Sequence, residues 1–515
     1  MEYSKTKRKD GVRIPTKHVK RKLMTFLPLS AVCVAVAILL IYVDAIQIIA
    51  NYRTHLTYGS EIHELLSLEA HGIHVSAYLF NVTNGEAFLS GEDDKMKVEE
   101  IGPFTYKELR SNLDIEFDEE AGVVRYSPLA KPVFMPDESI AHPRDVVVTM
   151  PNIAMLAMSS MTSKEPYFTQ LAFKLLLNHL KTKSLVNQTA EEFLWGYDEP
   201  LIKLGNTILP GWISFEKLGL MDRLYDTKTE YRLEVAMDQF EKFHILKMNG
   251  VQGLKVWDFE DPTKRSECNS FANAYEGIMY PNEMKPGTPL KIFRNVLCRF
   301  LPLDYQGNMT LESGVDALQY KVSKTTYDIN NDTECLCGRG MCINGVSDLS
   351  PCYYSLPLAL SNAHFLYGDS KLFERVEGLN PNEEQHGSNF LIEPRIGIAL
   401  KSEFSVQVNV VVNKVDFNKE VERFSEFVVP ICYFKMVQPE LLEANKYNLN
   451  LMYVIGPAIV LSLQIFLVLL GLLMLAYCVY LLLPHFVRSS GQGIIFQTSK
   501  DNKSPATKLP LLGSR

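Results

Sequence analysis

Two long apolar runs constrain what this 515-residue chain can fold into more than any other feature. Leu23–Val43 provides 21 residues without a charge, and Leu451–Leu483 provides 33. A bilayer core of about 30 Å needs roughly 20 apolar residues as a helix, so both runs are long enough to span a membrane. The second exceeds that length and is expected to tilt or to extend into the interface. The first is longer than the apolar part of a signal peptide and follows a long basic segment, which favours an uncleaved signal anchor.

The charge is distributed unevenly around these runs. The formal charge of −8 combines +7 on residues 1–22, −1 at Asp44, −18 on residues 51–450 and +4 on residues 484–515. The positive-inside rule therefore places both short tails in the cytosol and some 400 residues outside. The expected organisation is a cytosolic tail at 1–22, a transmembrane helix at 23–46, an extracellular or lumenal ectodomain at 47–450, a second transmembrane helix at 451–483 and a cytosolic tail at 484–515. An acidic chain is also a poor candidate for binding nucleic acid.

Four N-x-[ST] sequons in the large loop agree with export. They predict N-glycosylation at Asn81, Asn187, Asn308 and Asn331. A fifth sequon, at Asn502, falls in the predicted cytosolic tail and should be unused.

The loop also holds a cluster of six cysteines between residues 268 and 352. A zinc site would usually show C-x2-C pairs with histidine in register, and neither occurs here. Three disulfides are the better interpretation in an oxidising compartment, although spacing alone leaves 15 pairings open. Cys432 is the odd residue and is expected to be a buried free thiol. The clustered residues are Cys268, Cys298, Cys335, Cys337, Cys342 and Cys352.

The ectodomain is predicted to be one α+β domain. Apolar and polar residues alternate over Phe404–Val412, which predicts a half-buried strand, and 73–80 and 144–150 are further strand candidates. Helical signals concentrate at about 152–200, where Thr189 and Glu192 form a capping box. One apolar helical stripe is expected there, made of Phe168, Leu171, Ala172, Leu175, Leu176 and Leu180.

Nothing in the loop has the pattern of an active site. It contains no G-x-S-x-G, H-E-x-x-H, P-loop or G-x-G-x-x-G motif, and its Asp and Glu pairs fit solvated turns of an acidic domain. We therefore expect no catalytic residue, no metal site and no cofactor.

A basic stretch interrupts the acidic loop. Residues 166–190 contain no Asp or Glu but contain Lys174, His179, Lys181 and Lys183. Lys174 and Lys181 are seven residues apart and should share a helix face opposite much of the apolar stripe. The stretch is either an ordinary solvated helix face or a docking patch for anionic ligands.

Several longer motifs make a family resemblance specific. They are YLFNVTN (78–84), IGPFTY (101–106), EFLWGYDEP (192–200), CLCGRGMC (335–342), HFLYGD (364–369), GLNPNEEQH (378–386) and LIEP (391–394). With these motifs the chain resembles the class B scavenger receptors, the family of fatty acid translocase and lysosomal integral membrane protein. The resemblance covers most of the chain.

The resemblance implies a distorted antiparallel β-barrel core, an apical helical bundle and an internal apolar tunnel leading to the bilayer. By similarity, Lys181 and Lys183 match apical lysines that meet ligands. The implied disulfides are Cys268–Cys335, Cys298–Cys352 and Cys337–Cys342, and the last of these differs among relatives.

The expected function is capture of lipids or lipoprotein-borne ligands at the apex and delivery through the tunnel to the membrane. Fatty acids, sterols, carotenoids or phospholipids and lipoprotein-like carriers are the implied partners, and self-association is left open. A sorting receptor for a soluble protein is the alternative. A gated channel is disfavoured because the spans offer only Gln464 and a boundary Asp44 to line a pore. The plasma membrane is the favoured location, with the endosome or lysosome as the alternative.

Overall fold

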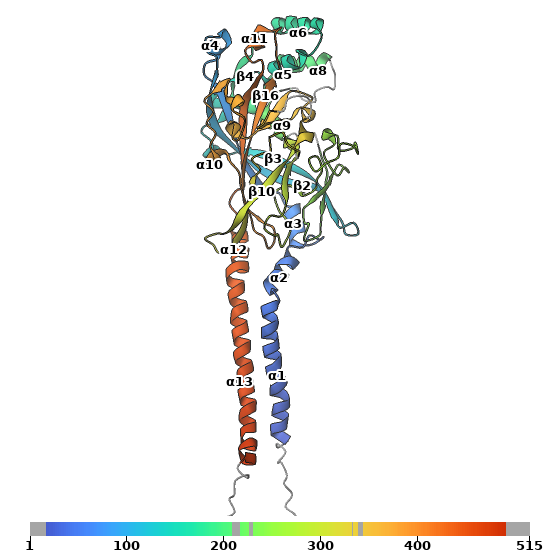
Figure 1. The fold of residues 1–515 in the computed structure, drawn as a ribbon, viewed down its shortest axis with the longest axis vertical. Coiled ribbons are helices and arrows are strands. Elements are labelled where there is room, and N and C mark those ends of the chain that lie inside the picture. Colours follow the sequence, from blue (N-terminus) through green and yellow to red (C-terminus); the bar gives the residue numbers. More distant parts are fainter. Residues whose placement is uncertain (1–16, 209–216, 226–229, 332, 338–342, 491–515) are drawn as a thin grey trace, which may run out of the picture. The chain divides into compact units, whose positions relative to one another are not determined.

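A computed structural model describes residues 17–208, 217–225, 230–331, 333–337 and 343–490 (Figure 1). The chain forms two compact units. Residues 47–453 make the first, which we call the barrel domain, and residues 1–46 with 454–515 make the second, which we call the helical unit.

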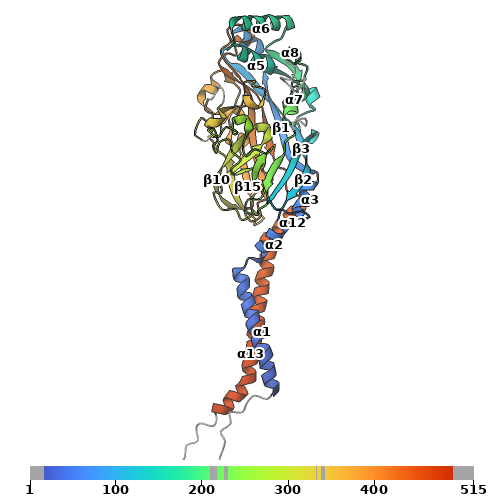
Figure 2. The same ribbon diagram turned by 90° about the vertical axis from the view of Figure 1, so that its right-hand side faces the viewer.

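The barrel domain is built on one large, mostly antiparallel sheet that curls into a nearly closed barrel (Figures 1 and 2). This confirms the expected α+β class with a barrel core. The strands follow the order β7-β6-β3-β2-β1-β17-β16-β15-β11-β10-β9-β8, with β12, β13 and β14 attached beside this path. Their bounds are β1 Ala70–Val82, β2 Met96–Asp118, β3 Val123–Phe134, β6 Leu233–Ala236, β7 Ile245–Met248, β8 Ala274–Tyr275, β9 Leu290–Arg294, β10 Arg299–Thr310, β11 Asp316–Val322, β12 Val346–Asp348, β13 Leu358–Ser361, β14 Val376–Glu377, β15 Asn389–Ile392, β16 Ala399–Val412 and β17 Phe427–Val437.

A buried ion pair joins strands that are far apart on this path. Arg110 on β2 donates from Nη2 to both carboxylate oxygens of Glu276, each at 2.9 Å, and Glu276 directly follows β8. The hydroxyl of Tyr126 on β3 donates to the same carboxylate at 2.7 Å. These contacts tie β2 and β3 to β8 and so help to close the barrel.

Strand β16 differs from the half-buried strand that its sequence predicts. Its residues from Phe404 to Val412 are buried on both faces. The polar face is covered because its side chains form hydrogen bonds with other parts of the chain. The side-chain oxygen of Gln407, Oε1, accepts the backbone N–H of His364 at 2.7 Å, and Asn409 Nδ2 donates to Ser361 Oγ at 3.0 Å. Alternation correctly indicated the strand but not what lies over its polar face.

Helices gather at one end of the barrel domain, which we call the apex (Figures 1 and 2). The expected helical region 152–200 also contains a strand, β5, which pairs with β4 through Asn187 and Thr149 among others. Ser160 holds the first apical helix against β16, since its hydroxyl donates to the Val411 carbonyl at 3.1 Å and accepts the Asn413 N–H at 2.8 Å. The apical elements are β4 Val147–Pro151, α5 Ile153–Thr162, α6 Tyr167–Leu180, β5 Leu185–Thr189, α7 Ala190–Trp195, α8 Pro200–Ile208 and α9 Leu220–Leu224. The capping box of Thr189 and Glu192 begins α7 as predicted.

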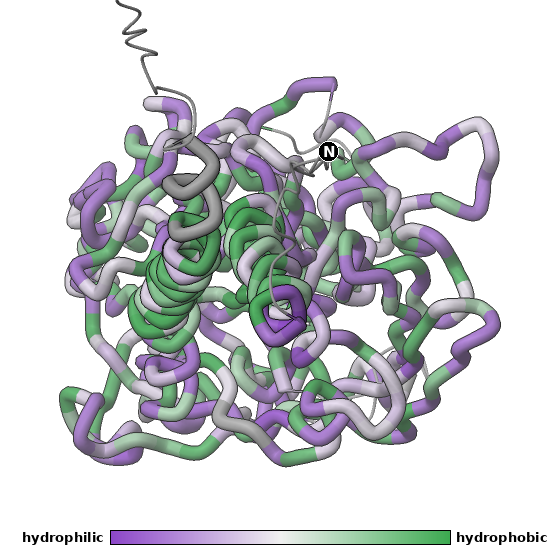
Figure 3. Tube along the Cα trace, turned by 90° about the horizontal axis from the view of Figure 1, so that it is seen from below, coloured by the Kyte–Doolittle hydropathy of each residue, from purple (hydrophilic) through white to green (hydrophobic). Residues whose placement is uncertain are grey.

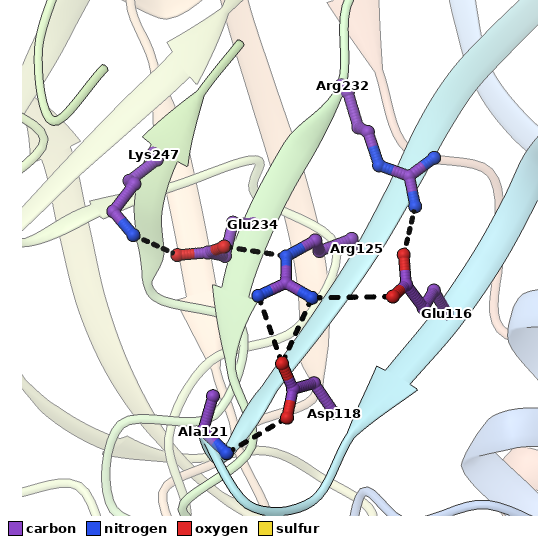
Figure 4. Close-up of polar contacts among 7 residues, drawn as sticks. All are labelled: Glu116, Asp118, Ala121, Arg125, Arg232, Glu234 and Lys247. Carbon is purple, nitrogen blue, oxygen red and sulfur yellow. Dashed lines mark hydrogen bonds and ion pairs between the residues drawn. The ribbon is translucent and has the colours of Figure 1, made fainter. Parts of the chain in front are cut away.

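Ion pairs cross four strands on another part of the sheet (Figure 4). Arg125 is the centre of this network: its Nε lies 2.7 Å from Glu234 and its Nη1 lies 3.1 Å from Asp118. The remaining members are Glu116, Arg232 and Lys247.

The remaining α-helices of the barrel domain are α2 Ala45–Arg53, most of which belongs to it, α3 Glu61–Ser67, α4 Gly85–Ser90, α10 Glu383–His386, α11 Lys419–Glu422 and α12 Glu443–Asn450.

Two disulfides join described residues of the barrel domain. They join Cys268 to Cys335 and Cys298 to Cys352, which are two of the pairings implied by the family resemblance. The expected bond between Cys337 and Cys342 includes a residue outside the described ranges and stays a prediction. Cys432 is a buried free thiol, as expected, and its burial in the apolar core raises its pKa.

The helical unit contains two apolar helices, α1 (Lys17–Tyr42) and α13 (Gly456–Ser490), and both are hydrophobic over most of their length (Figure 3). They lie against each other, since the Ser30 hydroxyl donates to the Gly471 carbonyl at 2.9 Å. A Cβ at Gly471 would lie only 2.9 Å from Val34 Cγ2. Glycine thus permits the close approach that is typical of membrane helix pairs.

The ends of these helices differ from the expected spans. α1 ends at Tyr42 and a new helix begins at Ala45, so the expected span 23–46 contains a break at Asp44. Lys17–Tyr42 and Glu443–Leu483 are each long and apolar enough to cross a membrane. The uncharged run Leu23–Val43 ends at this break, and the expected span passed it because Ala45 and Ile46 are apolar.

Candidate functional site

The apex presents an exposed apolar face on α6. Phe168 is 80% exposed and Leu175 60%, and Tyr167 and Leu171 are exposed beside them. The predicted stripe therefore lies mostly on the exposed side of α6, and the buried residue of this helix is Leu177. Contiguous exposed apolar side chains on a folded domain mark a site that contacts a partner or a lipid.

The three predicted docking lysines lie at the apex, but not on one helix face. Lys181 is the residue that ends α6, with φ of 52°, so it lies beyond the helix, whereas Lys174 is half-buried on α6. Lys181 and Lys183 are both exposed. The expectation that Lys174 and Lys181 share a face is wrong because the helix ends before Lys181 in a left-handed turn.

An apolar cavity lies inside the barrel domain next to the apical elements. Its walls come from α5, α9, β13, β16 and β17, and include Ile153, Leu224, Leu358, Val406 and Phe434. The free volume is about 60 Å³. That is smaller than the roughly 150 Å³ of a cavity that holds benzene, so a lipid chain can enter only when the lining side chains move.

The sequence did not predict a cluster of titratable groups in which two buried histidines meet the exposed Glu100. His364 and His386 stack with ring centroids 4.2 Å apart, and His364 Nε2 lies 2.7 Å from Glu100 Oε2. The Tyr433 hydroxyl bonds to the same carboxylate. Both histidines lie in motifs that carry the family resemblance, HFLYGD and GLNPNEEQH, and that was the available signal.

The three groups Glu100, His364 and His386 are close enough to suggest a metal site within the described residues. Their hydrogen bonds argue otherwise. His364 Nδ1 accepts the Asn380 N–H at 3.1 Å, and His386 Nδ1 accepts the Asn382 N–H at 3.2 Å. Each ring therefore carries its proton on Nε2, whereas a metal-bound histidine usually donates its second ring N–H to an acceptor. The cluster fits a stacked pair of rings whose Nδ1 atoms already accept hydrogen bonds from the backbone.

This cluster predicts acid sensitivity. Burial and the neighbouring His364 ring lower the pKa of His386 to about 4. Since the unfolded chain takes up this proton near pH 6.5 and the folded chain only near pH 4, stability falls as the pH drops between these values. We expect a loss of about 2 kcal/mol at about pH 5 relative to neutral pH. Thermal unfolding of the full chain at both pH values measures it. His386→Phe, which cannot take up this proton, should lose less stability, and an unchanged pH dependence in that variant would contradict the assignment.

The predicted glycosylation sites differ in their surroundings. Asn187, Asn308 and Asn331 are exposed. Asn81 is half-buried on β1, and its side-chain oxygen accepts the Thr149 N–H at 2.8 Å. Glycan attachment at all four sites remains a prediction.

The fold and the apolar helices define a class of membrane protein in which a barrel-like α+β domain lies between two apolar helices in the sequence. The chain belongs to the CD36 family, whose family model matches residues 28–482. It is 28% identical to scavenger receptor class B member 1 of Bos taurus over 439 residues, which cover 83% of this chain and 81% of the relative. It is 26% identical to lysosome membrane protein 2 of Homo sapiens over 446 residues, covering 84% and 87%. The chain is thus a scavenger-receptor-type membrane protein, from a family of receptors rather than enzymes.

Proposed function

We propose that the protein captures lipids at the apex and passes them through the barrel interior to the membrane. The observation that carries the proposal is the apolar cavity next to an apex that exposes Phe168 and Leu175. Each methylene held in water costs about 0.8 kcal/mol, so a lipid that leaves a carrier needs a continuous apolar path. The exposed α6 face supplies the first contact, and the cavity supplies the next.

Release is as important as capture in this function. The cavity walls are side chains without covalent or metal chemistry, so flow follows the lipid gradient. Exposed ion pairs contribute about 1 kcal/mol or less, so Lys181 and Lys183 can attract an anionic head group without retaining it. The narrow free volume means that side-chain movement in the cavity controls the passage.

Charge reversal at the apex tests the docking step. We expect Lys181→Glu with Lys183→Glu to lower uptake of a fluorescent anionic phospholipid by about three- to tenfold, since two weak attractions become repulsions. The measurement is uptake by cells that display equal amounts of each variant at the surface. The matched control is Lys131→Glu with Lys285→Glu, which changes the same charge at exposed lysines elsewhere. Equal uptake by all three proteins would remove the apical lysines from the mechanism.

Direct lipid analysis distinguishes this function from the alternative, a sorting receptor for a soluble protein. The full chain is purified from membranes, exchanged into lipid-free detergent and extracted, and the bound lipids are identified by mass spectrometry. Lipid at a fixed ratio to protein is expected. A protein without lipid that retains one soluble partner through its apex would favour the sorting receptor.

A further inference from the structure

A second pocket lies where one edge of β16 lacks a partner strand. On this edge β16 pairs with β15 up to Glu403 and with β13 from Gln407 onward. Phe404, Ser405 and Val406 pair with neither strand. Such an interruption leaves an opening in the wall of the sheet.

A pocket of about 280 Å³ occupies this position. Leu301, Tyr327 and Phe404 form apolar walls, and Ser405 and His386 contribute polar atoms. It shares no lining residue with the apolar cavity, although Phe404 lines the pocket and Val406 lines the cavity on the same strand. The volume is near the lower end of ligand pockets, which begin at about 300 Å³.

Two buried polar groups in the pocket lack protein partners. Ser405 is 6% exposed, and its hydroxyl has no hydrogen-bond partner in the described part of the chain. His386 is 5% exposed and uses Nδ1 to accept the Asn382 N–H, so its proton is on Nε2. No hydrogen bond from Nε2 to a described residue exists. A buried polar group without a partner costs about 1–3 kcal/mol, so the Ser405 hydroxyl is expected to bond to something that enters the pocket, and His386 Nε2 can donate to the same group.

The two groups select for a hydrogen-bond acceptor. With Nδ1 occupied, the His386 ring presents a fixed N–H, and its low pKa of about 4 keeps the ring neutral near pH 7. The Ser405 hydroxyl lines the same pocket and can donate as well. The charged residues of the lining are Asp304, Lys321 and Lys324, and both lysines are paired with Glu383, at 2.8 and 3.4 Å. These charges are balanced, so hydrogen bonding decides what binds.

We propose that this pocket binds the carboxylate end of a single-chain amphiphile, which accepts hydrogen bonds from Ser405 Oγ and His386 Nε2. The first part of the acyl chain lies on Leu301, Tyr327 and Phe404 and continues toward the barrel interior. This assignment rests on the proposed lipid transport and adds to it a lateral site, separate from the apex.

Photolabelling tests the assignment. The full chain in nanodiscs is irradiated with a palmitate that carries a diazirine near its carboxylate, and the labelled peptides are identified by mass spectrometry. Label is expected in residues 321–327, 386–388 or 404–405. Ser405→Ala should weaken labelling about tenfold or more, because a hydrogen bond to a charged group is lost. Ser402→Ala is the matched control, since Ser402 is also a buried β16 serine without a hydrogen-bond partner but does not line the pocket.

The outcomes separate this proposal from the transport function. Label at the apex or cavity alone would overturn the lateral site and leave transport intact, whereas no specific label anywhere would count against both. Unchanged labelling of Ser405→Ala and of His386→Phe would mean that these groups bond only to water, and would overturn the proposal. Equal competition by the matching fatty alcohol would overturn the carboxylate assignment.

Discussion

Replacing Arg110 by methionine is expected to destabilise the barrel domain by about 3–5 kcal/mol, because it leaves the Glu276 carboxylate buried without its cation. The two side chains are only 11% and 8% exposed, so water cannot take the place of the guanidinium. The Tyr126 hydroxyl remains as a donor but carries no charge. Because the pair joins β2 to the residue after β8, its loss should also loosen the closure of the barrel. Thermal or denaturant unfolding of the purified full chain measures the effect.

Two further variants make this prediction specific. Arg110→Met combined with Glu276→Leu should recover most of the loss, since removing both charges leaves neither unpaired. Arg125→Met is the matched control: Arg125 pairs with the carboxylates of Glu116, Asp118 and Glu234, but it is 27% exposed in the network of Figure 4. Exposed pairs contribute about 1 kcal/mol or less each, so this variant should be much milder. Equal destabilisation by Arg110→Met and Arg125→Met would contradict the role of burial.

The chain organisation and the presence of strands could be predicted because they depend on local patterns. The apolar runs overlap most of the helices α1 and α13, and the predicted strand segments at 73–80 and 404–412 lie within β1 and β16. These signals need only the spacing of residues along one element. The pairing of the cysteines did not follow from spacing and came from the family resemblance.

Contacts between distant segments could not be predicted. The alternation in β16 suggested a solvated face, but His364 and Ser361 cover it through bonds to Gln407 and Asn409. The apolar stripe of α6 suggested a buried face, yet Phe168 is exposed. In both cases the local pattern was real, and the tertiary surroundings decided which face met water.

The same limit applies to the candidate site. Lys181 and Lys183 were found because an acid-free stretch is visible in the sequence. The apolar cavity and the pocket at β16 were not found, because their walls combine residues more than 100 positions apart.

Filling the apolar cavity should have the largest effect on function. Leu358 on β13 is half-buried and lines the cavity, whose free volume is about 60 Å³. We expect Leu358→Trp to lower lipid delivery at least about tenfold, because overpacking costs about 1–3 kcal/mol and a passing lipid must displace the added ring. The measurement is transfer of a fluorescent lipid from donor vesicles into liposomes that contain the purified protein.

The opposite change at the same position gives the decisive comparison. Leu358→Ala widens the cavity and should keep or raise the transfer rate, even though it removes apolar contacts and lowers stability. Leu113→Trp is the control for the tryptophan itself, since Leu113 lies on β2, is 41% exposed and does not line the cavity. A route through the barrel therefore predicts opposite effects of large and small side chains at residue 358. If lipid instead moves along the outer surface, both variants should transfer lipid at the rate of the unchanged protein, and the barrel interior would have no part in delivery.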